Sequence, residues 1–213
     1  MSLALAAAAS VVSQADAALN LVANGTFEDS LNTRPSNGSL PAGSTLISGW
    51  KVGADEIAWG LPNGEWSYVV PSHHSFLDLS GYHNSSPYGS VSQATPINTG
   101  LGQQYLVSFM LGGSSLENSH APQVQVHAGS AFSSFTAPAA TEWAQYSFTF
   151  TANSSSTGLQ FTGLDPSLGG SQGFIGLADV SMTAVPEPDT LIAGALVLLP
   201  FTLNMVRSFR RKS

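Results

Sequence analysis

The sequence predicts an all-β fold, an antiparallel β-sandwich, followed by a C-terminal transmembrane helix. Two observations in the central part predict the sandwich. Apolar residues recur at every second position in several short segments, and clusters of Gly, Asn, Ser and Pro separate these segments. A third observation predicts the helix, because an apolar run at residues 191–206 is followed by basic residues.

The strands are predicted from alternation in the central part of the chain. Tyr105, Val107, Phe109 and Leu111 give the clearest case, since side chains two residues apart lie on one face of a strand. The same alternation marks residues 124–126, 146–150 and 159–161. The turn-forming clusters lie at residues 35–43, 81–89, 112–119, 153–156 and 165–173. Roughly ten short strands with such loops are typical of a sandwich.

The N-terminal residues 1–17 are predicted to be a signal peptide. An apolar, Ala-rich core at residues 3–12 precedes Ala15, Asp16 and Ala17, which have the small-x-small form of a signal-peptidase site, with cleavage before Ala18. No Lys or Arg precedes the core, so the peptide is atypical or the true start codon lies upstream. The alternative is a buried N-terminal helix.

The C-terminal residues 185–213 predict a membrane-associated tail. Val185, Pro186, Glu187 and Pro188 form an extended strip, because each proline fixes φ and lacks a backbone donor. The apolar run follows, and four cations then hold its end on the cytoplasmic side, which places the preceding domain across the membrane. These cations are Arg207, Arg210, Arg211 and Lys212. The alternative is an ordinary membrane anchor behind a Pro-rich linker.

This order of Val-Pro-Glu-Pro, apolar run and basic tail resembles the PEP-CTERM sorting signal of Gram-negative bacteria. The resemblance covers about the last 29 residues, from Val185 to Ser213. It implies export across the inner membrane, anchoring there by the tail, and processing by an exosortase-type enzyme. Release or attachment at the cell surface, outer envelope or extracellular matrix would follow, in bacteria that often make exopolysaccharide. The chain then divides into signal peptide (1–17), one domain (18–184) and sorting signal (185–213).

Composition limits the partners of the central domain. The chain contains no Cys, so neither disulfides nor thiolate chemistry contribute. Arg34 and Lys51 stand against ten acidic residues between positions 28 and 179, a net charge of −8 with neutral His. Such a domain is not expected to bind nucleic acid or anionic lipid, and it suits a cation or neutral sugars.

The first and last segments of the domain suggest a metal site. Residues 20–28 are expected to form a strand with Thr26 and Glu28 on one face, and residues 173–181 a last strand with Asp179 facing away from Val180. If these strands meet, their oxygens suit Ca²⁺, which takes about six to eight oxygen ligands. The alternative is a pair of solvated carboxylates.

A second resemblance spans nearly the whole domain. The motifs are LVANGTFE at 21–28, GWKV at 49–52, FLDLSG at 76–81, GSVSQ at 89–93, GQQYLVSF at 102–109 and ADVS at 178–181. They are similar to the choice-of-anchor C family. The resemblance implies a galactose-binding-like jelly roll related to carbohydrate-binding modules, with Thr26, Glu28 and Asp179 as ligands of a structural Ca²⁺. The family has two adjacent Asp before Val-Ser, and Ala178 replaces the first.

Exposed aromatic residues are the candidates for sugar contact, because a sugar's C–H face stacks on an aromatic ring while its hydroxyls need polar partners. Those expected to bind are Trp66, Tyr68, Tyr82 and Tyr88. Trp50 and Trp59 are expected in the core. The five histidines match no zinc-ligand spacing and are expected to be solvated.

Three functions follow from these features. The first is a non-catalytic module that binds exopolysaccharide. The second is a structural or adhesive matrix protein without a sugar ligand. A glycoside hydrolase is the weakest hypothesis, because no catalytic carboxylate pair stands out and the Gly-x-Ser-x-Gly match at residues 169–173 lies in one of the turn-forming clusters.

Overall fold

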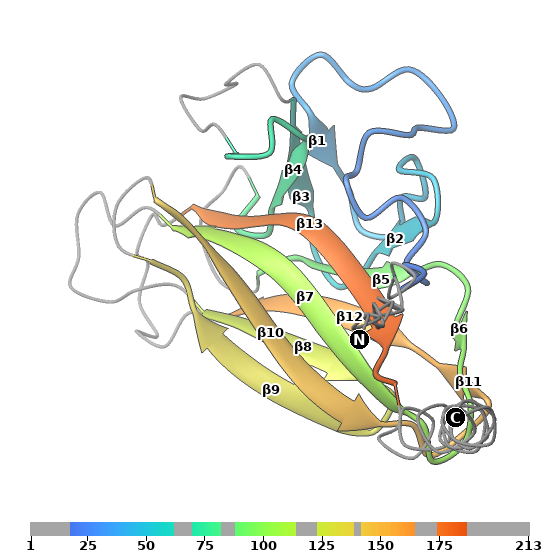
Figure 1. The fold of residues 1–213 in the computed structure, drawn as a ribbon. Helices are drawn as coiled ribbons and strands as arrows, with labels where there is room; N and C mark the ends of the chain where they lie inside the picture. Colours follow the sequence, from blue (N-terminus) through green and yellow to red (C-terminus); the bar gives the residue numbers. More distant parts are fainter. Residues whose placement is uncertain are drawn as a thin grey trace, which may run out of the picture.

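The computed structural model describes residues 18–61, 70–81, 88–113, 123–138, 142–164 and 174–186. Within these ranges the protein is built from thirteen β-strands and contains no helix (Figure 1). Every pair of neighbouring strands is antiparallel. The predicted all-β antiparallel sandwich is therefore confirmed.

One layer of the sandwich is a six-stranded sheet in the order β1-β3-β4-β13-β7-β10. Its strands are β1 (Ser39–Leu40), β3 (Ile57–Gly60), β4 (Phe76–Asp78), β13 (Ile175–Ala184), β7 (Gln104–Gly113) and β10 (Trp143–Thr151). The long strands β13, β7 and β10 lie side by side at the front of Figure 1. The last long strand of the domain thus lies in the middle of this sheet, between β4 and β7.

The second layer is a five-stranded sheet in the order β2-β5-β12-β8-β9. Its strands are β2 (Trp50–Val52), β5 (Ser90–Gln93), β12 (Leu159–Leu164), β8 (Gln123–Ala128) and β9 (Ala131–Thr136). A small sheet pairs β6 (Ile97–Asn98) with β11 (Ser156–Thr157). In Figure 1, β8 and β12 lie behind β7 and β10, and β9 continues their sheet below β10, so the two large sheets form the layers of the sandwich.

The core fills the space between the sheets, because each long strand turns one set of alternate side chains inward. Val107, Phe109 and Leu111 of β7 are at most 1% exposed, as the alternation in the sequence predicts. Across the core, the ring of Phe109 meets that of Phe161 of β12 edge to face, with centroids 5.3 Å apart. This contact joins the two sheets directly.

Trp50 and Trp59 are buried in the core, as predicted, with exposed fractions of 1% and 2%. Both indoles also bind the N-terminal segment. Trp50 Nε1 donates to the carbonyl oxygen of Asn24 over 2.9 Å, and Trp59 Nε1 donates to that of Phe27 over 3.0 Å. A buried indole N–H requires such a partner, and here it fixes residues 24–27 against the sandwich.

The prediction of a first strand at residues 20–28 is wrong, because this segment consists of turns. Asn24 and Phe27 have φ values of 49° and 57°, in the left-handed region that interrupts a strand. The amide of Phe27 donates to the carbonyl oxygen of Asn24 over 3.1 Å, which closes the turn. Thr26 and Glu28 therefore do not share a strand face.

The hydrogen-bonded sheet reaches the predicted domain boundary at residue 184 and continues one residue beyond it. Thr183 and Ala184 still pair with β7, and the amide of Val185 donates to the carbonyl oxygen of Gln104 over 2.9 Å. Pro186 is the last residue described. Signal peptide, apolar run and basic tail lie outside the described residues, and none of the described segments is a helix long and apolar enough to cross a membrane.

Candidate functional site

Of the aromatic residues predicted to contact sugar, one lies within the described residues. Tyr88 is 7% exposed and belongs to the hydrophobic core, so its ring is not accessible to a ligand here. The expectation for Tyr88 therefore fails, because the residue packs in the hydrophobic core and not in an exposed loop. Trp66, Tyr68 and Tyr82 lie outside the described residues.

The outer face of the five-stranded sheet is polar, and alternation is the cause. On β8, Val124 and Val126 are fully buried, so Gln123, Gln125 and His127 point away from the core. On β12, Phe161 is fully buried and its neighbours on either side point outward. These outward neighbours are Gln160 and Thr162. The face therefore presents amides and hydroxyls side by side.

The pairing register aligns five outward side chains in one row across the whole sheet, which we call the outer row. Lys51 is paired with Ser92, Ser92 with Gln160, Gln160 with His127, and His127 with Phe132. Adjacent strands are about 4.8 Å apart, so the row spans about 19 Å from end to end. It runs across the strands and ends at the two edge strands of the sheet, β2 and β9.

An aromatic platform forms the β9 end of the outer row. The ring of Phe132 stacks on the imidazole of His127 with centroids 5.5 Å apart and an interplanar angle of 24°. Phe132 is 65% exposed although full burial of a Phe side chain is worth about 1.5–3 kcal/mol. A ligand that covers this ring recovers part of that free energy.

Hydrogen-bonding groups lie next to the platform. His127 Nε2 and Gln125 Oε1 are 2.9 Å apart, so Gln125 orients the imidazole. The side chains of Gln160 and Thr162 form no hydrogen bond with any described residue, and both are half-buried. Amide and hydroxyl groups of this kind both donate and accept, which is the chemistry that a sugar hydroxyl requires.

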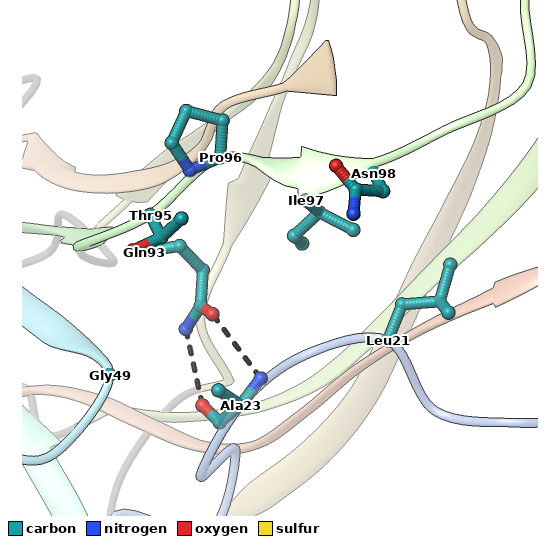
Figure 2. Close-up of a pocket in the computed structure, with 8 residues that line it drawn as sticks. All are labelled: Leu21, Ala23, Gly49, Gln93, Thr95, Pro96, Ile97 and Asn98. Carbon is teal, nitrogen blue, oxygen red and sulfur yellow. Dashed lines mark hydrogen bonds between the residues drawn. The ribbon is translucent and has the colours of Figure 1, made fainter. Parts of the chain in front are cut away.

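A separate pocket of about 310 Å³ lies between the N-terminal segment and the connection from β5 to β6 (Figure 2). Its lining residues are Leu21, Ala23, Gly49, Gln93, Thr95, Pro96, Ile97 and Asn98. Figure 2 shows the Gln93 amide reaching to the backbone of Ala23, where it donates to the oxygen and accepts from the nitrogen, both over 3.2 Å. The side-chain amide of Gln93 is therefore already occupied by hydrogen bonds within the protein, and no carboxylate lines this pocket.

The predicted calcium ligands lie where the N-terminal segment meets β13. Val180 N donates to the carbonyl oxygen of Gly25 over 2.9 Å, so the two segments do approach each other. Asp179 sits in a β-bulge with φ of 51°, and its Oδ1 lies 2.6 Å from Nδ1 of His74. Thr26 is half-buried and Glu28 is exposed.

The donor chemistry of Thr26, Glu28 and Asp179 fits Ca²⁺, since each offers a side-chain oxygen, whereas the carbonyls of Asn24, Gly25 and Phe27 already accept hydrogen bonds. His74 competes for one oxygen of Asp179. In the described part of the chain, no group of three or more His, Cys, Asp or Glu side chains is placed to hold a metal ion. The calcium site stays a prediction.

A buried carboxyl lies on the opposite side of the sandwich from the outer row. Asp78 on β4 is 8% exposed, and burial raises the pKa of its carboxyl from the usual 3.8 to about 6. Hydrogen bonds from the amide and hydroxyl of Ser80 and from the amide of Ile175 oppose that rise in pKa. Asp78 therefore changes charge within the mildly acidic range.

Sequence reasoning missed the outer row. The alternation of Gln123, Gln125 and His127 with valines marks one polar and one apolar face of β8, and this signal was available. Phe132 gave no signal, because an exposed Phe cannot be told from a buried one without the pairing register. The row itself depends on the order of five strands far apart in the sequence.

These features define an antiparallel β-sandwich domain with an open, polar and aromatic sheet face. The chain belongs to the DUF642 family, described as a protein of unknown function, whose model matches residues 20–168. It is also 31% identical over 182 residues to halomucin of Haloquadratum walsbyi, covering 83% of this chain. The chain spans only 2% of the length of halomucin.

Solved structures share the fold at low sequence identity. The arabinose-bound α-L-arabinofuranosidase MgGH51 matches with a TM-score of 0.50 and 15% identity, over 78% of this chain and 26% of that one. The carbohydrate-binding module TmCBM61, solved with β-1,4-galactotriose, matches with a TM-score of 0.49 and 12% identity, over 65% of this chain and 90% of that one. The similarity to the arabinofuranosidase supports the β-sandwich assignment.

Proposed function

We propose that this protein is an exported, non-catalytic carbohydrate-binding protein of the bacterial cell surface or extracellular matrix. Its sandwich binds exopolysaccharide through the outer row. The exposed ring of Phe132, stacked on His127 and flanked by Gln125 and Gln160, is the observation that carries this proposal. A sugar ring placed on Phe132 brings its hydroxyls to the amides beside it.

Sorting is the second part of the proposal, and it depends on the resemblance to PEP-CTERM proteins. The tail anchors the chain in the inner membrane until an exosortase-type enzyme acts at residues 185–188. Among the described residues of this strip, Val185 is held by hydrogen bonds to Gln103 and Gln104, whereas Pro186 is exposed. A processing enzyme that grips an extended strip requires access to such exposed residues.

Affinity electrophoresis of the full chain through gels that contain different polysaccharides tests the proposal. We expect retardation by at least one polysaccharide and a loss of affinity of about tenfold in Phe132→Ala, because truncation of an aromatic contact residue that carries binding energy costs more than about 1 kcal/mol. Leu101→Ala is the matched control, because Leu101 is 76% exposed but lies outside the five-stranded sheet.

The outcomes separate the hypotheses. Unchanged migration of the wild-type protein across the whole panel would leave the structural or adhesive matrix protein as the better hypothesis. Release of reducing sugar during incubation with a retained polysaccharide would contradict the non-catalytic assignment. Equal retardation of wild type and Phe132→Ala would place the binding site elsewhere.

A further inference from the structure

We infer that the outer row selects glycans with anionic substituents, and that Lys51 binds the substituent; this inference rests on the proposed function. The chemistry that it names is an acidic sugar chain carrying carboxylate or sulfate groups. Composition alone pointed to a cation or to neutral sugars, since the domain has a net charge of −8. The positions of the charged residues in the fold indicate instead that the five-stranded sheet can accept an anionic ligand.

The five-stranded sheet contains no acidic residue. Its strands read WKV, SVSQ, LQFTGL, QVQVHA and AFSSFT, with one Lys and one His. Every described carboxylate lies elsewhere, in β4, in β13 or in the connections between strands. These residues are Glu28, Asp29, Asp55, Glu56, Asp78, Glu142 and Asp179. Within the described part of the chain, an anionic ligand on this sheet meets no carboxylate from the sheet's own strands.

Lys51 marks the β2 end of the outer row. It is exposed, between Trp50 and Val52, which are 1% and 3% exposed and point into the core. Its ammonium forms no ion pair with any described residue. On a domain where acids outnumber bases five to one, a lysine without such a partner on the polar sheet face is available to an anionic ligand.

The two ends of the row impose a length on the ligand. Phe132 and Lys51 are four strand spacings apart, about 19 Å, so one sugar ring cannot contact both. An oligosaccharide that lies across the strands stacks on Phe132 at one end and presents its charged substituent to Lys51 at the other. Discrimination between acidic and neutral glycans therefore requires a chain of several sugars.

The expected size of the effect is modest, because Lys51 is exposed. Exposed ion pairs contribute about 0.2–1 kcal/mol, which corresponds to a factor of about 1.4 to 5 in affinity. The contribution is screened by salt, since the Debye length falls from about 10 Å at 0.1 M to about 3 Å at 1 M. The inference thus predicts a selectivity of a few fold that disappears at high ionic strength.

The test measures binding of the full chain to polygalacturonate, alginate and hyaluronate, each compared with its carboxyl-reduced, neutral form. Lys51→Gln removes the charge, and Lys51→Arg keeps it. We expect wild type and Lys51→Arg to prefer the acidic member of at least one pair by a factor of about 2 to 5. In Lys51→Gln the ratio of the affinity for the acidic member to that for the neutral member should fall to about one, and 1 M NaCl should abolish the preference in the wild type.

Other outcomes overturn the inference. Equal affinity of the wild type for acidic and neutral members, or an equal effect of Lys51→Gln on both, would refute the role of Lys51 and leave the proposed function standing. Binding to neither member of any pair would refute both. Retention by polyglutamate as strong as by polygalacturonate would mean that charge alone, and not an acidic sugar, is recognised.

Discussion

The Oδ1 atom of Asp78, on strand β4 of the six-stranded sheet, accepts a hydrogen bond of 2.7 Å from the hydroxyl of Ser80. The same oxygen accepts from the amides of Ser80 and Ile175 over 2.9 and 3.1 Å. Three donors on one oxygen do not fully offset the burial of the carboxyl, whose pKa stays raised at about 6.

Asp78 is therefore expected to make stability depend on pH. In the unfolded chain its pKa is near 3.8, so between pH 4 and 6 the native state binds more protons than the unfolded state. The stabilising contribution is fully present below pH 3.8 and is lost as the pH rises through about 6. A shift of this size corresponds to roughly 3 kcal/mol.

The variant Asp78→Asn isolates this effect, because its side chain does not titrate. The free energy of unfolding of Asp78→Asn minus that of wild type should rise by roughly 2–2.5 kcal/mol between pH 4 and 7, most of the full effect. Urea unfolding at several pH values measures the difference, and all other titrating groups cancel in it. Parallel pH profiles for the two proteins would contradict the prediction.

Gly25 is predicted to tolerate no side chain. A methyl group there would overlap the carbonyl oxygen of Val180, which lies on the backbone and cannot move aside. We expect Gly25→Ala to lower the free energy of unfolding by roughly 2–4 kcal/mol. Gly158→Ala is the control, since no atom lies within 4 Å of its added methyl group, and it should be neutral or stabilising by about 0.4–1 kcal/mol. Similar losses in both variants would contradict the prediction.

Calcium is predicted to raise the melting temperature of the protein relative to excess EDTA. A ligand that binds only the native state stabilises it by about 2.7 kcal/mol when its concentration is 100 times Kd. Glu28→Ala should abolish the shift. His74→Gln should enlarge it, because the imidazole that now contacts Oδ1 of Asp179 is removed. No shift in either wild type or His74→Gln would refute the calcium site.

Much of the fold could be predicted from local pattern. Val107, Phe109 and Leu111 alternate with polar or half-buried residues, and their strand β7 lies where the alternation places it. Strand β9 was not predicted, because its aromatic residues Phe132 and Phe135 are three positions apart and give no period of two.

The N-terminal segment shows why a motif can mislead about conformation. Residues 20–28 look like a strand because oxygen-bearing residues occupy positions 24, 26 and 28, but Asn24-Gly25 is also a turn dipeptide. Tertiary contacts determine that this segment forms a turn and not a strand. The ring of Phe27 is fully buried against Trp50, with centroids 5.1 Å apart, and this packing holds Phe27 in a left-handed conformation that it would otherwise avoid.

The two ends of the domain meet on one strand. The amide of Leu21 donates to the carbonyl oxygen of Met182 over 2.8 Å, and Asn20 Oδ1 accepts from the amide of Met182 over 3.0 Å. The chain thus enters the sandwich beside the point where it leaves. Domains with adjacent ends can be inserted into other chains as side branches that add little to contour length. A pull on both ends would therefore load the bonds at Met182 at the N-terminal end and the β13–β7 pairs at Ala184 and Val185 at the C-terminal end at the same time.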